Sequence, residues 1–142
     1  EHLEDDRAGV RELGRVMRAG GFGLFFVPAF ELLWGLQDDV SEHRRRYTAD
    51  SLRRRLESAG LRVLRISYFN TALFLPILAA RLAMRLYRPP VHSENSLGIP
   101  VLDRLFGALF AAEAPLLSRF DFPIGVSLLA LAQRPVFVSR PL

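Results

Sequence analysis

Apolar residues follow two different periods along this chain, and they predict helices and strands in turn. Between Asp6 and Gly20 the apolar positions recur every three or four residues, which predicts a helix over about residues 6–18 with a glycine stop. The next stretch, FGLFFVP (22–28), is a continuous apolar run closed by proline. Such a run is typical of a strand that is buried on both faces, so a central parallel strand is expected there.

The same order repeats further along the chain. Residues 29–48 mix aromatic and charged residues without sustained periodicity, which predicts a long functional loop. Thr48 then suits the N-cap of a helix that ends at Gly60, and LRVLRISYF (61–69) reads as a strand. Two helix-glycine-strand units in succession predict an α/β domain with crossover helices on a mostly parallel sheet.

Beyond Asn70 the apolar residues become nearly continuous. Helices are expected over 71–88 and 101–120, with a loop between them, and a closing strand over 125–134. The longest uncharged stretch, Ile66 to Ala80, is shorter than the about 20 residues that cross a bilayer. An interfacial helix over 71–88 stays open as an alternative. Its lipid-facing residues would be Phe74, Leu75, Ile77 and Leu78, and its headgroup-facing residues Arg81, Arg85 and Arg88.

Composition narrows the classes of function. With 50% hydrophobic residues among 142, a globular domain is expected, and the absence of cysteine excludes disulfides, thiolate catalysis and cysteine-ligated zinc. The net charge of +4 is small, and the arginine triplets 44–46 and 53–55 do not form one face, so no nucleic-acid partner is expected. No signal-peptide pattern opens the sequence, so a cytoplasmic protein is expected, with peripheral membrane contact through 71–88 as the alternative.

Three stretches resemble class I S-adenosylmethionine-dependent methyltransferases. EHLEDDRAGVRELGRVMRAGGFGLFFVPAF is similar to the part of that family that runs from the end of the fourth strand into the fifth. HRRRYTADSLRRRLESAGLRVLRISYFN resembles the next part of a branch of small bacterial methyltransferases, and GVSLLALAQR resembles the antiparallel seventh strand. The resemblance implies an α/β fold, the C-terminal part of a Rossmann-like seven-stranded sheet. Residues 1–142 would be a single truncated domain, with the apolar helices of 71–120 as a cap-like insertion before the last strand.

The family's glycine-rich turn and the acidic residue after its second strand have no counterpart here. Gly20, Gly21 and Gly23 follow a helix and precede a strand, which is the reverse of the order that places an anion on a helix N-terminus. The N-terminal strands of the sheet are therefore expected to be missing. The resemblance implies methyl transfer from S-adenosylmethionine to a small-molecule or lipid-like acceptor, and we expect this chain alone neither to bind the cofactor tightly nor to turn over. The alternative is a non-catalytic module that associates with a membrane or a partner.

Candidate site residues follow from the resemblance and from strand ends. Glu1 and His2 would edge the methyl-donor pocket, or they are simply the frayed start of a helix. His43 and Tyr47 are candidates for a base or a hydrogen-bond partner, with a solvated loop as the other interpretation.

Other residues of the same loop and of the strand ends are candidates for the acceptor site. A guanidinium of the first arginine triplet could hold a carboxylate or phosphate, or the triplet is a solvated run with salt bridges. Aromatic and amide side chains after the strands could line an apolar pocket, or they pack in the core. The substrate-binding candidates are Phe30, Trp34, Arg44, Arg45, Arg46, Tyr68 and Asn70.

Two further expectations concern residues outside that set. Arg53, Arg54 and Arg55 are successive helical residues, so we expect them on the solvent side of their helix. No metal site is expected, because His2 and His92 show no ligand spacing with Asp121 or Glu94.

Overall fold

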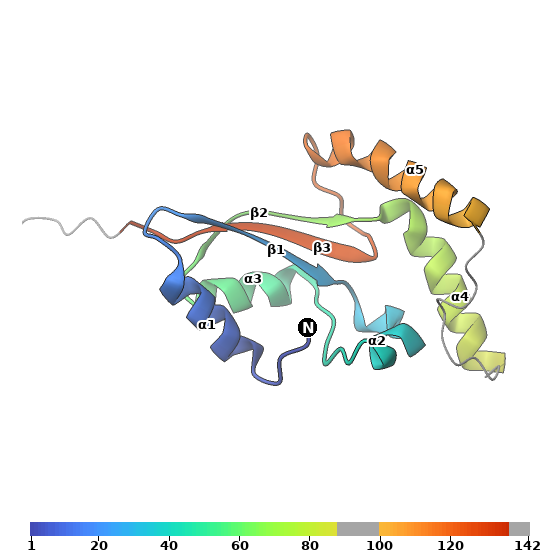
Figure 1. Ribbon diagram of the computed structural model, residues 1–142, viewed down its shortest axis with the longest axis horizontal. Coiled ribbons are helices and arrows are strands. Elements are labelled where there is room, and N and C mark those ends of the chain that lie inside the picture. The colour runs from blue at the N-terminus through green and yellow to red at the C-terminus, as the bar shows by residue number, and fades with distance from the viewer. Residues whose placement is uncertain (88–99, 137–142) are drawn as a thin grey trace, which may run out of the picture.

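The computed structural model describes residues 1–87 and 100–136, which form a mixed α/β fold (Figure 1). Its helices are α1 (Asp6–Val16), α2 (Leu36–Val40), α3 (Ala49–Ser58), α4 (Phe74–Tyr87) and α5 (Pro100–Leu117). Its strands are β1 (Phe22–Pro28), β2 (Arg62–Phe69) and β3 (Ser127–Gln133), and 3-10 turns occur at η1 (Glu31–Leu33) and η2 (Thr71–Leu73). The helix-strand order predicted from the sequence is confirmed, and α4 and α5 precede the last strand.

The three described strands form one sheet in the order β1-β3-β2, and both pairings are antiparallel. The expectation of a mostly parallel sheet with β1 at its centre is wrong for these strands. β1 and β2 do run in the same direction, but β3 lies between them, and β1 stands at the edge. Both β1 and β2 end opposite Ser127, so their carboxyl ends lie at one edge of the sheet.

One face of the sheet is covered by α1 and α3, which lie side by side beneath it in Figure 1. Leu52 and Leu56 of α3 pack with the alternate residues of β3 that point to this face, Leu128, Ala130 and Ala132. The small side chains of β3 let α3 approach the central strand closely. This layer is the core of the described chain.

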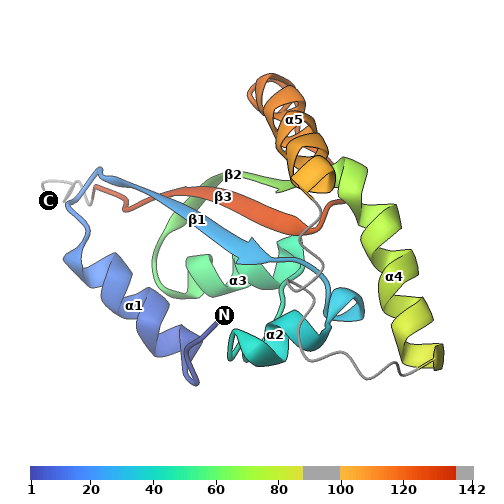
Figure 2. The ribbon, with the colours of Figure 1, turned by 45° about the vertical axis from the view of Figure 1, so that its right-hand side comes forward.

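The opposite face of β1 is open, which corrects the expectation that this strand is buried on both faces. Phe22, Leu24 and Phe26 alternate with the core-facing residues and are each more than half exposed. α5 lies on this side of the sheet but over the end of β2, as Figure 2 shows. An arginine of β2, Arg65, anchors the end of α5 by donating to the Leu117 carbonyl at 2.5 Å, and it also donates to the Phe120 carbonyl and to Asp121 in the segment that follows.

Local signals in the sequence place several helix ends correctly. The Thr48 side chain accepts from the Ser51 amide as the N-cap of α3, and Gly20 and Gly60 take positive φ values of 78° and 79°. The loop after β1 differs from expectation, because it contains η1 and α2. Both are short, so neither produces a helical period in the sequence.

No helix within the described residues is long and apolar enough to cross a membrane. The orientation expected for an interfacial helix over 71–88 is wrong at three positions. Phe74 is buried, Arg81 is buried against the loop glycine Gly35, and Arg85 donates to the Leu32 carbonyl at 2.9 Å. Arg88 lies outside the described residues.

Candidate functional site

The candidate site lies at the carboxyl edge of the sheet, where the loops that follow β1 and β2 emerge. The loop of residues 29–48 returns to β1 at Tyr47, whose amide donates to the Pro28 carbonyl at 2.9 Å. The start of the chain runs beside this loop, and the Arg44 amide donates to the Glu1 carbonyl at 2.7 Å. In Figures 1 and 2 the N-terminus accordingly lies between α1 and α2.

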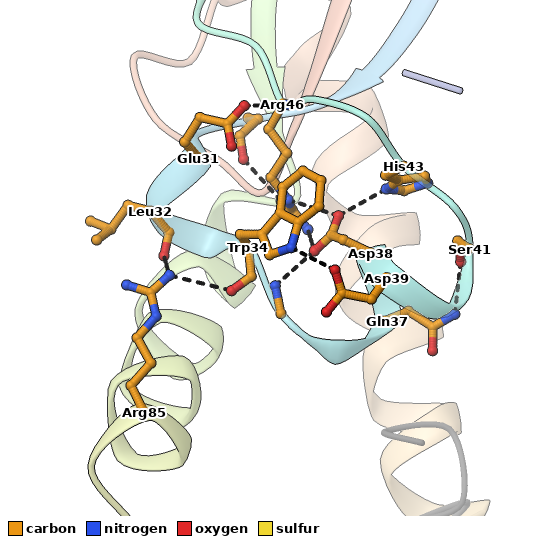
Figure 3. Close-up of polar contacts among 12 residues, drawn as sticks. Glu31, Leu32, Trp34, Gln37, Asp38, Asp39, Ser41, His43, Arg46 and Arg85 are labelled. Carbon is orange, nitrogen blue, oxygen red and sulfur yellow. Dashed lines mark hydrogen bonds and ion pairs between the residues drawn. The ribbon is translucent and has the colours of Figure 1, made fainter. Parts of the chain in front are cut away.

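A buried carboxylate, Asp38, organises the loop (Figure 3). Its side chain is 1% exposed and accepts two hydrogen bonds of 2.9 Å from the guanidinium of Arg46. It also contacts Nδ1 of His43 at 2.8 Å and accepts from the Gly35 amide at 2.9 Å. Burial alone would raise the pKa of Asp38, but the hydrogen bonds from Arg46, His43 and Gly35 outweigh it, so the pKa lies below its ordinary value.

The guanidinium of Arg46 makes its contacts within the protein. Its side chain is only 8% exposed, and besides Asp38 it donates to the Ala29 carbonyl at 3.0 Å. Its own amide donates to the Glu31 carboxylate at 2.7 Å. The guanidinium fork therefore faces Asp38, and it ties the end of the loop to the start.

The other two arginines of the first triplet point toward the start of the chain. Arg45 pairs with the buried carboxylate of Asp6 at 2.6 Å and donates to the Glu4 carbonyl at 2.6 Å. Arg44 is 54% exposed and lies 3.6 Å from the Glu4 carboxylate. Arg44 is therefore the member of the triplet that offers its guanidinium to solvent.

Tyr47 belongs to the same buried cluster around Asp6. Its hydroxyl donates to Asp6 at 2.8 Å, and burial together with this carboxylate raises the pKa of Tyr47 well above its ordinary value. A phenolate is therefore disfavoured, and Tyr47 is positioned as a hydrogen-bond donor within the fold. Arg55 of α3 also pairs with Asp6 at 2.9 Å, which corrects the expectation that the whole second triplet faces solvent.

The aromatic candidates lie close to one another but are packed. The rings of Phe30 and Tyr68 stack with centroids 4.8 Å apart, and Phe74 meets Phe30 edge-on at 5.6 Å. The Tyr68 hydroxyl accepts from the Ala49 amide at 3.0 Å, at the beginning of α3. Trp34 is partly buried and donates its indole N–H to Asp39 at 3.0 Å, as seen in Figure 3.

Asn70 lines a cavity among the described residues. It follows β2 in the left-handed conformation, with φ 61° and ψ 41°. The cavity has a volume of about 320 Å³ and is also lined by Phe69, Phe110 and Glu113. A second apolar cavity of about 340 Å³ lies on the other side of Glu113, whose carboxylate accepts from the Thr71 amide at 3.1 Å. Both volumes are in the range of small-molecule pockets.

Glu1 and His2 come together with His43, although 41 residues separate the two histidines in sequence. The rings of His2 and His43 meet at 4.8 Å with an interplanar angle of 71°. One nitrogen of each ring and a carboxylate oxygen of Glu1 all lie within 4.8 Å of one another. The catalytic candidate His43 and the cofactor candidates Glu1 and His2 therefore form one cluster.

Sequence reasoning missed Asp6, Asp38 and Asp39 as parts of the site. In the sequence, Asp6 marked only the start of the first helical pattern, and Asp38 and Asp39 were only charges in the loop of residues 29–48. The available signal was a balance of charge, because a loop with three consecutive arginines needs nearby carboxylates if any of its arginines is to be buried.

Comparisons with known proteins add little to this geometry. No family model matches the chain, and no curated protein is similar to it in sequence. Among solved structures the chain is similar to the [4+2]-cyclase SpnF, with 19% sequence identity and a TM-score of 0.43. The match covers 95% of this chain and 46% of SpnF, so the chain spans less than half of that protein's length.

Proposed function

We propose that this chain is part of an S-adenosylmethionine-dependent methyltransferase that acts on a small-molecule or lipid-like acceptor. The observation that carries the proposal is the contact between residues 1–5 and residues 43–47. These are the two segments whose sequences resemble the donor side and the acceptor side of that family, and they meet at the carboxyl edge of β1. Open α/β sheets bind their ligands at this edge.

The described residues fit only the edge of a methyl-donor pocket. The glycine that opens a helix after β1 is Gly35, and its amide already donates to Asp38 at 2.9 Å, so it is not offered to the anionic part of the cofactor. We propose that the strands that would hold it precede Glu1 in the native protein and pair with the open edge of β1. This chain would then supply the loop side of the pocket and the acceptor site.

Its residues have separate roles in this proposal. Asp38 holds the imidazole of His43 through Nδ1, so the other ring nitrogen, Nε2, would serve as the base for an acceptor proton. Arg44 is placed to bind an anionic group of the acceptor, because its guanidinium is exposed. The cavity beside Asn70 takes the apolar part of the acceptor.

The test begins with the coding sequence upstream of Glu1, which should encode a strand, a glycine-rich turn and a helix. The protein that includes this segment should transfer radiolabelled methyl groups from S-adenosylmethionine to acceptors in a lipid and metabolite extract. Changing His43 to Gln should lower kcat, and changing Arg44 to Ala should raise KM for an anionic acceptor. A start codon directly before Glu1, or an extended protein without cofactor binding, contradicts the proposal.

A second candidate function rests on the apolar surface of the two late helices. Leu75 and Leu86 of α4 and Phe110 and Leu116 of α5 are exposed large hydrophobic residues. Such a surface favours a non-catalytic module that associates with a membrane or a partner. Co-sedimentation with anionic phosphatidylglycerol vesicles tests the membrane part, and a protein that stays in the supernatant at low salt excludes it. Replacing Leu75 and Leu86 by Ser should abolish any binding, whereas replacing Leu24 on the open face of β1 by Ser should not.

A further inference from the structure

We propose that Glu1, His2 and His43 form a binding site for a divalent transition-metal ion, with Zn²⁺ as its best match. Two imidazoles and one carboxylate are a ligand set that such ions use when further coordination positions stay open for water or substrate. The donor atoms come from two segments that are distant in sequence, and the fold brings them within 4.8 Å of one another. Spacing along the chain therefore gives no sign of the site.

The donor atoms must close around an ion to bind it. Zn–N and Zn–O bonds are about 2.0–2.2 Å long, so donor atoms on one tetrahedral ion lie about 3.4 Å apart. The donor atoms of this cluster lie within 4.8 Å of one another, so they must approach by up to about 1.4 Å. His2 is 57% exposed, so a rotation of its ring can bring its nitrogen to the ion without disturbing the core.

The surroundings of His43 distinguish this cluster from a chance meeting of polar side chains. Metal-bound histidines generally donate their other ring nitrogen to a carboxylate, which fixes the ring and raises the basicity of the ligand nitrogen. Asp38 provides this carboxylate, at 2.8 Å from Nδ1 of His43. Arg46 and the Gly35 amide hold Asp38 in turn, so the second shell is already in place.

The ligand set also predicts which ions bind. Mg²⁺ and Ca²⁺ prefer all-oxygen sites, so they should not compete, whereas Co²⁺ should bind as a spectroscopic substitute for Zn²⁺. A bound ion would tie the start of the chain to the loop that follows β1. It should therefore stabilise the folded protein in proportion to the logarithm of metal concentration. This proposal does not depend on methyl transfer, because its ligands and its measurements involve no cofactor, and an ion bound to His43 would take the place of the base proposed for that residue.

The test is titration of the metal-free chain with Zn²⁺, followed by calorimetry and by the shift of the thermal midpoint. We expect one ion per chain and a midpoint that rises with Zn²⁺ but not with Mg²⁺. His43→Ala and His2→Ala should each lower the affinity for Zn²⁺ at least about tenfold, because removing even a residue that only hydrogen-bonds to a metal ligand costs about that much. His92→Ala is the control for a change in histidine content, because His92 is the third histidine of the chain and is not one of the three proposed ligands. It should leave the affinity unchanged.

A free α-amino group beside His2 could chelate an ion without His43. The titration is therefore repeated on a chain with an acetylated N-terminus. Two results together support the site. The acetylated chain still binds Zn²⁺ and loses this binding in His43→Ala, and bound Co²⁺ gives an absorption spectrum of tetrahedral or five-coordinate type. Loss of binding on acetylation, or equal binding by wild type and His43→Ala, overturns the proposal. Circular dichroism of each variant shows that it is folded, so that lost affinity is not lost structure.

Discussion

Replacing Arg46 by Met should destabilise the protein far more than the same change at Arg44. Arg46 is 8% exposed and Asp38 is 1% exposed, and two hydrogen bonds of 2.9 Å join them. Removing one member of such a pair leaves the other charge buried, which costs about 3–5 kcal/mol. Arg44 is 54% exposed and its partner Glu4 is even more exposed, so Arg44→Met should cost about 0–1 kcal/mol.

The assay is urea denaturation followed by circular dichroism, with both variants measured beside the wild type at pH 7. Small domains have unfolding free energies of about 5–15 kcal/mol, so Arg46→Met removes a large fraction and its midpoint should fall clearly. The double variant Asp38→Asn, Arg46→Met should recover part of the loss, because the buried charge of Asp38 is removed together with that of Arg46. Equal midpoints for Arg44→Met and Arg46→Met would refute the reasoning.

The stability that Arg46→Met loses should also depend on pH in a defined direction. In the wild type the pKa of Asp38 is lowered from 3.8, so its ionisation contributes stability above that value, and this contribution is lost as the pH falls through the lower folded pKa. Without Arg46, burial acts against fewer hydrogen bonds and the pKa of Asp38 rises. The variant then takes up its proton at a higher pH, so its deficit relative to wild type should narrow between pH 7 and pH 4. A deficit that stays constant over this range would contradict the assignment of the loss to Asp38.

Three further predictions concern sterics, Tyr47 and the cofactor. A Cβ at Gly125 would overlap the Phe69 carbonyl oxygen, so Gly125→Ala should lower the free energy of unfolding, measured in urea, by about 1–3 kcal/mol. A Cβ at Gly107 in α5 meets no atom, so Gly107→Ala should raise the free energy of unfolding by about 0.5–1 kcal/mol. Tyr47→Phe removes a hydrogen bond to the Asp6 carboxylate and should cost about 1.5–3 kcal/mol; its ultraviolet titration up to pH 10 should match that of the wild type, because Tyr47 stays protonated there. Calorimetric titration of the 142-residue chain with S-adenosylmethionine should detect no micromolar binding, and a micromolar dissociation constant would contradict the proposed missing half.

Local patterns predicted the elements well because local interactions determine them. The bounds of β1 are those of its apolar run, and the cap at Thr48 and the stops at Gly20 and Gly60 depend on the conformations of single residues. The order of the strands could not be predicted in this way. β3 comes last in sequence but inserts between β1 and β2, so two strands that look like neighbours with a parallel crossover never pair.

The candidate site was harder to predict than the fold, because its partners are distant in sequence. His43 looked like a solvated residue beside arginines, yet Asp38 and His2 surround it. Phe30 and Tyr68 were expected at strand ends, where they do lie, but the sequence did not indicate that their rings would stack on each other. An aromatic residue at a strand end can face a pocket or fill a gap in the core, and only the position of a third element decides which.

The two arginine triplets show how a single buried carboxylate changes the interpretation of charge. In the sequence the first triplet looks like a cluster in a loop and the second like the solvent-exposed face of a helix, with separate roles. In the fold, Arg45 from the first and Arg55 from the second both pair with Asp6, at 2.6 and 2.9 Å. Because Asp6 begins α1, these pairs join the start of the chain, the loop after β1 and α3 at one point. The remaining members, Arg44, Arg53 and Arg54, keep guanidinium groups on the surface, and of these three Arg44 lies beside the cluster of Glu1, His2 and His43. A search for an anionic ligand should therefore begin at Arg44.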